Sequence, residues 1–343
     1  MKRTKLRDIA DALDISVTTV SRALNNKSDI NINTKQAVLD MASQLNYKPN
    51  NLAVSLRKSD ALNVVGALLP IVSHQFFSSI LEGILAKARE YQYFVLLGES
   101  SHDAEKEKQI LEEFTDFGVS GILLAPSKHS DFSKNVLSII HTRTPVVVID
   151  RMYDNYDGNY VNNNDFSGAY KAVSHLIEQG YKNIAHIGSS DSWSIGHERR
   201  KGYIAALKDH GFQFDEAYLI ICDYNNKEEG EEEGYKASHR LFSLKNPPDA
   251  IFSVTDEIAT GIYGYAHDNG LVIPEQLGVV GFSNSEVSKY LQPGLTTLEQ
   301  NPVLMGSTSF EYFYRALNSN GQVYQTSLEP KLIVRKSSLK NAY

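Results

Sequence analysis

The feature that most constrains the fold is an alternation of short apolar runs with amphipathic segments, which begins near residue 61 and occurs twice along the chain. Runs such as 64–69 are apolar at nearly every position, which is typical of parallel strands buried on both faces. Segments such as 104–117 have apolar residues at helical spacing. The rhythm predicts two doubly wound α/β units. The expected strands are 64–69, 93–97, 121–125, 146–149, 184–187, 219–221, 250–254 and 277–280, and the expected helices are 76–91, 104–117, 131–141, 165–179, 198–210, 231–244 and 257–269.

Two similar units imply two lobes with a cleft between them. In such sheets ligands bind outside the carboxyl ends of the strands, so the residues just past each strand are the informative ones. Carboxylates, amides and a guanidinium suit sugar hydroxyls, and aromatic rings suit the C–H face of a sugar. Each residue alone is equally explained as a helix cap or a turn, and only their convergence on one cleft indicates a site. Those taken from strand ends are Ser127, Asp150, Arg151, the segment from Ser189 to Trp193, Tyr224, Thr255, Asp256, Ser283 and Asn284.

The N-terminal segment has a different pattern. Residues 6–13 are apolar at helical spacing, the chain breaks at 14–15, and Ser16 is placed to cap a second short helix whose inner face is Val20, Ala23 and Leu24. Two helices joined by a short turn form a helix-turn-helix, although an ordinary surface hairpin has the same pattern. The second helix turns short polar groups and one guanidinium outward, which suits base edges in a major groove. The outward residues are Val17, Thr18, Ser21 and Arg22.

A second motif follows at 47–56. Pro49 suits the first turn of a helix, Asn50 can contact phosphate, and Ala53 and Leu56 lie on one face. A helix this short has only marginal stability by itself in water. It is therefore expected to form only when DNA and a second chain support it. A plain interdomain linker helix is the alternative.

Over nearly its whole length the chain resembles the lac repressor and purine repressor family of bacterial transcription regulators, most specifically in Tyr47-x-Pro49-Asn50-x-x-Ala53-x-x-Leu56, which is similar to the family's hinge helix. The resemblance implies that this face meets its dimer mate over the minor groove, where Leu56 wedges between base steps. It also implies a core like that of periplasmic binding proteins. The candidate DNA-binding residues are Lys5, Leu6, Ser16, Val17, Thr18, Thr19, Ser21, Arg22, Asn25, Tyr47, Asn50, Ala53 and Leu56.

The resemblance also implies an effector site. Arg199 opens an Arg-x-x-Gly-aromatic pattern at 199–203 whose arginine holds the effector in the family, and Tyr224 falls where the family has a stacking aromatic. One position departs: Ser283 stands where many members have an acid, which puts the usual sugar contact in doubt. The candidate effector-binding residues are Phe76, Phe77, Ser127, Asp150, Trp193, Arg199, Tyr224, Asp256 and Ser283.

Charge is distributed unevenly. Residues 1–60 hold 10 Lys and Arg against 6 Asp, whereas the rest holds 24 basic and 35 acidic residues. Phosphate attracts the first part and repels the second, so only the N-terminal part is expected to bind DNA. The one cysteine, Cys222, excludes an intrachain disulfide and a thiolate metal cluster.

The sequence gives less support to other classes of function. The chain has no Gly-rich phosphate loop, nucleophile elbow, His-Glu-x-x-His or dinucleotide fingerprint, so we expect no enzyme, no cofactor and no metal. Two alternatives remain open: control by a phosphorylated protein co-effector, and constitutive DNA binding with a vestigial cleft. With neither a signal peptide nor a long apolar run, the protein is expected in the cytoplasm, associated with the nucleoid when bound to DNA.

The prediction is therefore a homodimeric repressor that binds a pseudo-palindromic double-stranded operator and responds to a small carbohydrate-type effector. The tail 337–343 lacks the leucine heptads of a tetramer. The expected domains are a DNA-binding head at 1–48, a hinge at 49–60 and a core at 61–340. Within the core, the first lobe is expected at about 61–162 plus 292–322, and the second at 163–291 plus 323–340.

Overall fold

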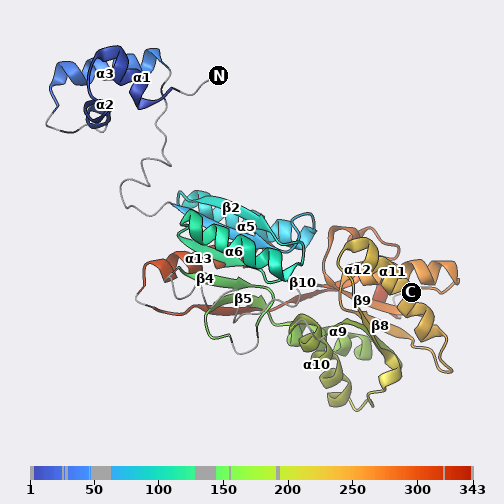
Figure 1. Ribbon diagram of the computed structural model, residues 1–343. Coiled ribbons are helices and arrows are strands. Elements are labelled where there is room, and N and C mark those ends of the chain that lie inside the picture. The colour runs from blue at the N-terminus through green and yellow to red at the C-terminus, as the bar shows by residue number, and fades with distance from the viewer. Residues whose placement is uncertain are drawn as a thin grey trace. The chain divides into compact units, whose positions relative to one another are not determined.

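The computed structural model describes residues 4–24, 27, 30–45, 47, 63–127, 144–153, 156–190, 194–319 and 321–340. The chain forms two compact units, 1–62 and 63–343, which we call the head and the core unit (Figure 1). Each is described by itself.

The described part of the head is a helix-turn-helix followed by a third helix. Its helices are α1 (Leu6–Leu13), α2 (Val17–Leu24) and α3 (Ile32–Gln44). Ile9, Val20 and Val38, one from each helix, are fully buried against one another. The Ser16 hydroxyl accepts a hydrogen bond from the Thr19 N–H at 3.0 Å, which satisfies an otherwise unpaired amide at the start of α2.

The core unit contains two six-stranded sheets, as the repeated rhythm predicts. The first has the order β11-β5-β4-β3-β1-β2 and the second the order β12-β10-β9-β8-β6-β7, and β12 is the antiparallel strand of the second sheet. The strands of the first are β1 (Val64–Leu69), β2 (Phe94–Glu99), β3 (Gly121–Leu124), β4 (Val146–Ile149), β5 (Asn159–Asn163) and β11 (Gln325–Leu328). Those of the second are β6 (Ile184–Ser189), β7 (Leu219–Cys222), β8 (Ala250–Ser253), β9 (Gly278–Ser283), β10 (Thr296–Glu299) and β12 (Lys331–Ile333).

Helices cover both sheets. In the first lobe they are α5 (Gln75–Glu90), α6 (Ala104–Phe117) and α13 (Pro302–Leu317); in the second, α9 (Asp165–Glu178), α10 (Ser194–Asp209), α11 (Lys227–Phe242) and α12 (Asp256–Asp268). The 3-10 turns are η1 (Glu216–Tyr218), η2 (Glu286–Lys289) and η3 (Lys336–Ser338). α5 and α13 pack closely because glycines at their contact have no side chain. A Cβ atom at Gly306 would collide with the Ile80 carbonyl, and one at Gly83 would collide with the Val303 carbonyl. No helix among the described residues is long and apolar enough to cross a membrane.

The chain crosses between the lobes three times: between β5 and α9, between β10 and α13, and between β11 and β12. The last two crossings therefore lie near residues 300 and 330, not at 291–292 and 322–323 as expected. The sequence expectation missed four strands. β5, β10 and β11 are rich in Asn, Thr, Ser and Gln and lack an apolar run, and β12 is only three residues long. The expected helix at 131–141 lies outside the described residues.

An imidazole lies inside the second lobe. His186 on β6 is fully buried, with its ring stacked on Phe252 at a centroid distance of 4.8 Å, and its Nδ1 donates to the Phe252 carbonyl at 2.9 Å. Burial lowers the pKa of His186 from 6.5 to about 4. The folded protein therefore keeps this ring neutral at a pH where an unfolded chain protonates it.

The lowered pKa of His186 predicts that this one residue makes the free energy of unfolding depend on pH. Between pH 6.5 and 4 the unfolded state binds a proton that the folded state refuses, so the free energy of unfolding falls as the pH falls. From pH 7 to pH 5 we expect His186→Phe to lose about 2 kcal/mol less than the unsubstituted protein in urea unfolding. Buried Asp150 and Asp256 have raised pKa values and act in the opposite direction, but both proteins contain them. Equal losses in the two proteins would contradict a neutral buried imidazole.

Candidate functional site

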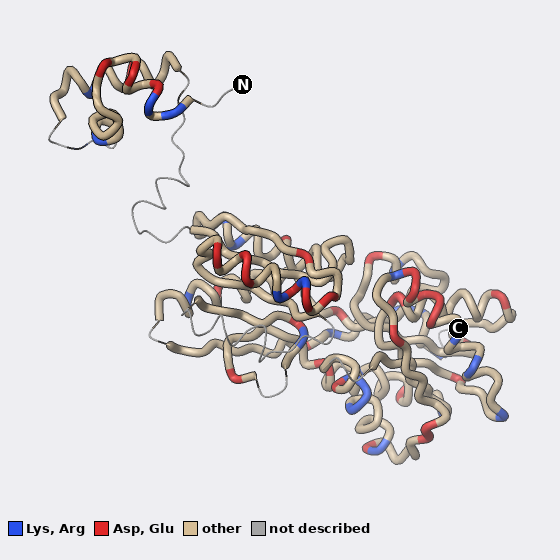
Figure 2. The backbone as a smooth tube through the Cα atoms, in the orientation of Figure 1, with Lys and Arg blue, Asp and Glu red and all other residues tan. Residues whose placement is uncertain are grey.

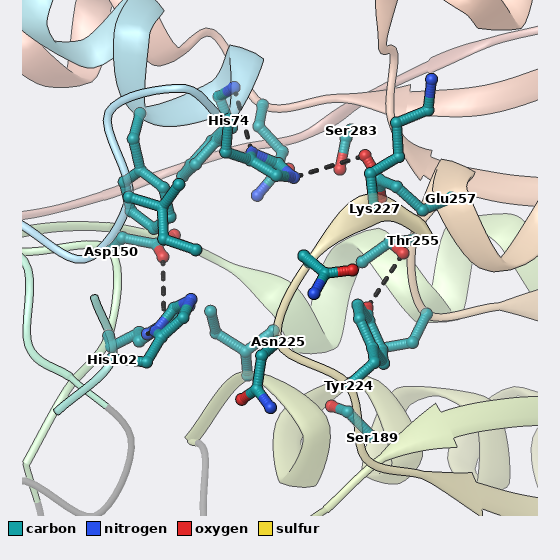
Figure 3. Close-up of a pocket in the computed structure, with 18 of the residues that line it drawn as sticks. His74, His102, Asp150, Ser189, Tyr224, Asn225, Lys227, Thr255, Glu257 and Ser283 are labelled. Carbon is teal, nitrogen blue, oxygen red and sulfur yellow. Dashed lines mark hydrogen bonds and ion pairs between the residues drawn. The ribbon is translucent and has the colours of Figure 1, made fainter. Parts of the chain in front are cut away.

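A pocket lies between the two lobes at the carboxyl ends of the strands (Figure 3). Its walls come from residues after β2, β4, β6, β7, β8 and β9 and from the first turn of α5. Doubly wound sheets place their ligands at this end because the strands stop there and their loops diverge. Six of the nine effector candidates line it: Phe76, Phe77, Asp150, Arg199, Tyr224 and Ser283.

Two other candidates, Asp256 and Ser127, do not line the pocket. Asp256 is fully buried; its carboxylate accepts from the Thr297 hydroxyl at 2.6 Å and from the Ser285 N–H at 2.7 Å, which fixes the loop after β9. Ser127 bonds Ser100 through its hydroxyl at 2.7 Å. Both side chains therefore form their hydrogen bonds with groups of the protein itself. The third, Trp193, lies outside the described residues.

Two polar atoms in the pocket wall have no hydrogen-bond partner among the described residues. They are Asp150 Oδ1 and Ser189 Oγ, on residues that are 3% and 6% exposed. Burial raises the pKa of Asp150 to about 7, although the nearby Arg151 guanidinium, at 3.9 Å, opposes the shift. Buried polar groups in folded proteins are nearly always paired, so these two atoms mark positions where a bound ligand would supply the partner.

Backbone strain gathers at the same place. Asp150 has φ 68°, His102 has φ 60° and Ser283 has φ 131°, and all three line the pocket. Such conformations are costly for residues with a side chain, and they persist where surrounding structure holds them, often at ligand sites.

Arg199 has strong partners within the protein. Its Nε donates to Asp165 at 2.8 Å, its second amino group pairs with the same carboxylate at 2.7 Å, and another N–H donates to the Val254 carbonyl. The Phe282 ring lies 3.5 Å below its guanidinium carbon. Arg199 therefore lines the pocket and also holds the second lobe together. Removal of Arg199 is therefore expected to disturb the fold of the second lobe as well as the pocket.

Several lining residues were not expected from the sequence. His74, Asn225, Glu257 and Gln300 all border the pocket, and Figure 3 shows the first three around the same cavity as the predicted Asp150. Gln300 follows β10, a strand that the apolar pattern did not reveal. His102, just past β2, was within reach of the strand-end rule and was overlooked.

In the head, α2 carries the expected outward face. Val17 is 41% exposed, and Thr18 and Arg22 are exposed as well. Ser16 and Thr19 bond each other through their hydroxyls at 2.8 Å and cap α2. Leu6 and Tyr47 pack against the head's core, whereas Lys5 is exposed. The candidates Asn25, Asn50, Ala53 and Leu56 lie outside the described residues.

The acidic residues of the core unit gather on helices. Figure 2 shows them recurring along α6 and α11. Phosphate would be repelled by these helices, which leaves the head as the DNA-binding part.

The Arg199 geometry predicts a large loss of stability. Arg199→Ala leaves the Asp165 carboxylate buried without its cation, and we expect it to lower the free energy of unfolding by about 3 to 5 kcal/mol. Arg200→Ala, at the next position of α10, serves as the control and should cost less than about 1 kcal/mol. Urea unfolding measures both, and similar losses would contradict the role given to the Arg199–Asp165 pair.

Comparison with known proteins agrees with this geometry. The family model for bacterial regulatory proteins of the lacI family matches residues 5–50, and the model for the periplasmic binding protein-like domain matches residues 173–338. The transcriptional regulator RegA of Clostridium saccharobutylicum is 30% identical over 339 residues, which are 98% of this chain and 99% of RegA. The transcriptional repressor PurR of Mannheimia succiniciproducens is 28% identical over 98% of this chain and 99% of its own length.

Solved structures show the same architecture. The transcription regulator CcpA of Lactococcus lactis is 27% identical, with a TM-score of 0.73 over 80% of this chain and 99% of its own. The lac repressor dimer bound to operator and the anti-inducer ONPF has a TM-score of 0.83 over 98% of this chain and 100% of its own, but at 23% identity the likeness shows the fold alone. With a lacI-type head, a two-lobed core and a relative 30% identical along almost the whole chain, this protein belongs to the lacI family of bacterial regulatory proteins.

Proposed function

We propose that this protein is a homodimeric transcriptional repressor whose operator affinity is switched by a sugar or sugar derivative bound between its lobes. The observation that carries the effector part is the pair of unsatisfied buried atoms in the pocket, Asp150 Oδ1 and Ser189 Oγ. Relatives named as repressors, among them PurR and the CytR of Escherichia coli, support repression.

The wall chemistry favours a carbohydrate. Asp150 Oδ1 can only accept a hydrogen bond when ionised, while Ser189 Oγ can donate or accept, and sugar hydroxyls do both. Phe76, Phe77 and Tyr224 supply the apolar surface that the C–H face of a sugar ring requires. Ser283 adds a hydroxyl in place of an acid, which favours an effector that needs no second carboxylate contact.

The dimer is supported by the edge strands. β2 closes one end of the first sheet, where Phe94 is 77% exposed and Leu97 43% exposed, and β7 closes one end of the second sheet with Ile221 42% exposed. Apolar side chains along an unpaired sheet edge invite another chain, and soluble proteins normally cover or charge such edges. A second copy of this chain would cover them, and a symmetric dimer would present two heads to a pseudo-palindromic operator.

Base reading by α2 is testable with one matched pair of substitutions. Arg22→Ala should lower specific affinity by about 1 to 3 kcal/mol and relax the preference at one base pair, because a guanidinium can bond a guanine edge in two places. Lys5→Ala, also at an exposed cation of the head, should weaken all sequences alike. Binding-site selection with each variant distinguishes the two effects. An unchanged consensus for Arg22→Ala would remove Arg22 from the reading face.

The effector proposal is tested in two steps. A thermal-shift screen of sugars and sugar derivatives against the full-length protein identifies a ligand through the stabilisation that binding gives. Operator affinity is then titrated with that ligand for the unsubstituted protein and for Tyr224→Ala, which removes an aromatic wall but leaves the Arg199–Asp165 pair intact. We expect the variant to bind operator and to lose the response, because a ligand shifts an equilibrium only through differential binding.

Tyr235→Ala is the control for this titration, because Tyr235 lies on α11 outside the wall of the pocket. It should respond like the unsubstituted protein. A normal response of Tyr224→Ala would contradict the pocket assignment. No stabilisation by any sugar would favour the protein co-effector or the constitutive binder instead.

A further inference from the structure

Two neighbouring residues of the first lobe reach across the cleft to the second. His74 and Gln75 stand at the start of α5, immediately before the pocket residues Phe76 and Phe77. The His74 Nε2 lies 3.4 Å from Glu257 Oε1 on α12, as the dashed line in Figure 3 shows. The Gln75 side-chain oxygen accepts from the Glu286 N–H on η2 at 2.9 Å.

The geometry of His74 fixes which of its nitrogens donates. Its Nδ1 accepts from the Phe76 N–H at 3.3 Å, which caps α5. Nδ1 therefore carries no hydrogen, and the neutral ring has its proton on Nε2, where it points at the Glu257 carboxylate. The α5 cap thus prepares the ring to donate across the cleft.

Glu257 needs this partner. It is 9% exposed, and its pKa is lowered: burial opposes the charged form, but hydrogen bonds led by the one from His74 outweigh burial. A carboxylate that stays charged at this depth is stabilised by donors, so separating the lobes would cost Glu257 its interlobe donor.

The position of the pair is also informative. His74 and Glu257 border the pocket, and they also border two further grooves beside it, one of them leading to the first turn of α13. The His74 side chain is 31% exposed, so the pair lies where the pocket meets solvent.

We propose that His74 and Gln75 form a latch that holds the two lobes together, through Glu257 and the Glu286 N–H. The latch is built from two hydrogen bonds, each of modest net strength. It is therefore strong enough to bias the lobes toward this arrangement and weak enough for a ligand's differential binding to change that bias. It goes beyond the proposed function because it concerns a direct contact between the lobes and not the ligand between them.

Single-molecule energy transfer on the full-length protein tests the latch without any effector. Dyes are attached to Val323→Cys, just before β11 in the first lobe, and to Lys208→Cys, near the end of α10 in the second; both residues are exposed and neither lines the pocket. The native Cys222 is buried, and burial raises its pKa to about 12, so it stays unlabelled. Labelled protein is mixed with a roughly twentyfold excess of unlabelled protein, so that dyes on two copies do not meet.

The test variant is His74→Asn combined with Gln75→Ala. The Asn side-chain oxygen can accept the Phe76 N–H in place of His74 Nδ1, but Asn is too short to reach Glu257, so a change cannot be assigned to loss of the cap. We expect the ratio of open to closed molecules to rise about 5- to 30-fold. Single His74→Asn and Glu257→Ala should each raise the ratio, and together they should raise it by less than the product, since both remove the same bond.

His267→Ala is the control, because His267 is a highly exposed histidine that pairs with Asp268 inside its own helix. It should leave the distance distribution unchanged. An unchanged distribution in the His74→Asn, Gln75→Ala variant overturns the latch. So does an equal shift with His267→Ala. Neither result bears on operator binding or on the effector response, so the proposed function stands or falls separately.

Discussion

The ion pair between Arg199 and Asp165 is the interaction on which the second lobe depends. It joins α10 to the first turn of α9, and the same guanidinium reaches the carbonyl at the end of β8 and covers a ring of β9. Four elements therefore meet at one buried cation. Such a pair adds little stability compared with apolar packing, but losing one partner is expensive, so it specifies a single arrangement of these elements.

That arrangement fixes Arg199, which lines the pocket. With Arg199 held by protein groups on two sides, only its remaining surface faces the cleft, and the groups with open hydrogen-bonding capacity are Asp150 and Ser189. A ligand site of this kind is organised before the ligand arrives, which reduces the ordering cost of binding.

Much of the fold and part of the pocket could be predicted from the sequence, for physical reasons that differ between elements. Strands β1 and β4 are buried on both faces and appear as unbroken apolar runs, so they were predicted to the residue. Strand β5 (Asn-Tyr-Val-Asn-Asn) and strand β11 are polar and partly exposed, so their composition resembles that of loops. The strand-end rule found Asp150, Tyr224 and Ser283. It also selected Ser127 and Asp256, because it locates a backbone position and says nothing about where the side chain points.

The two unsatisfied atoms of the pocket belong to opposite lobes. Asp150 follows β4 of the first sheet, and Ser189 ends β6 of the second. A ligand that bonds both acts as a two-ended linker, and its second bond forms at the high effective concentration that the first one creates. A molecule of half that length could bond one lobe only and could not link the two. Under the proposed function, fragments of the effector would therefore be expected to occupy the pocket without producing the response.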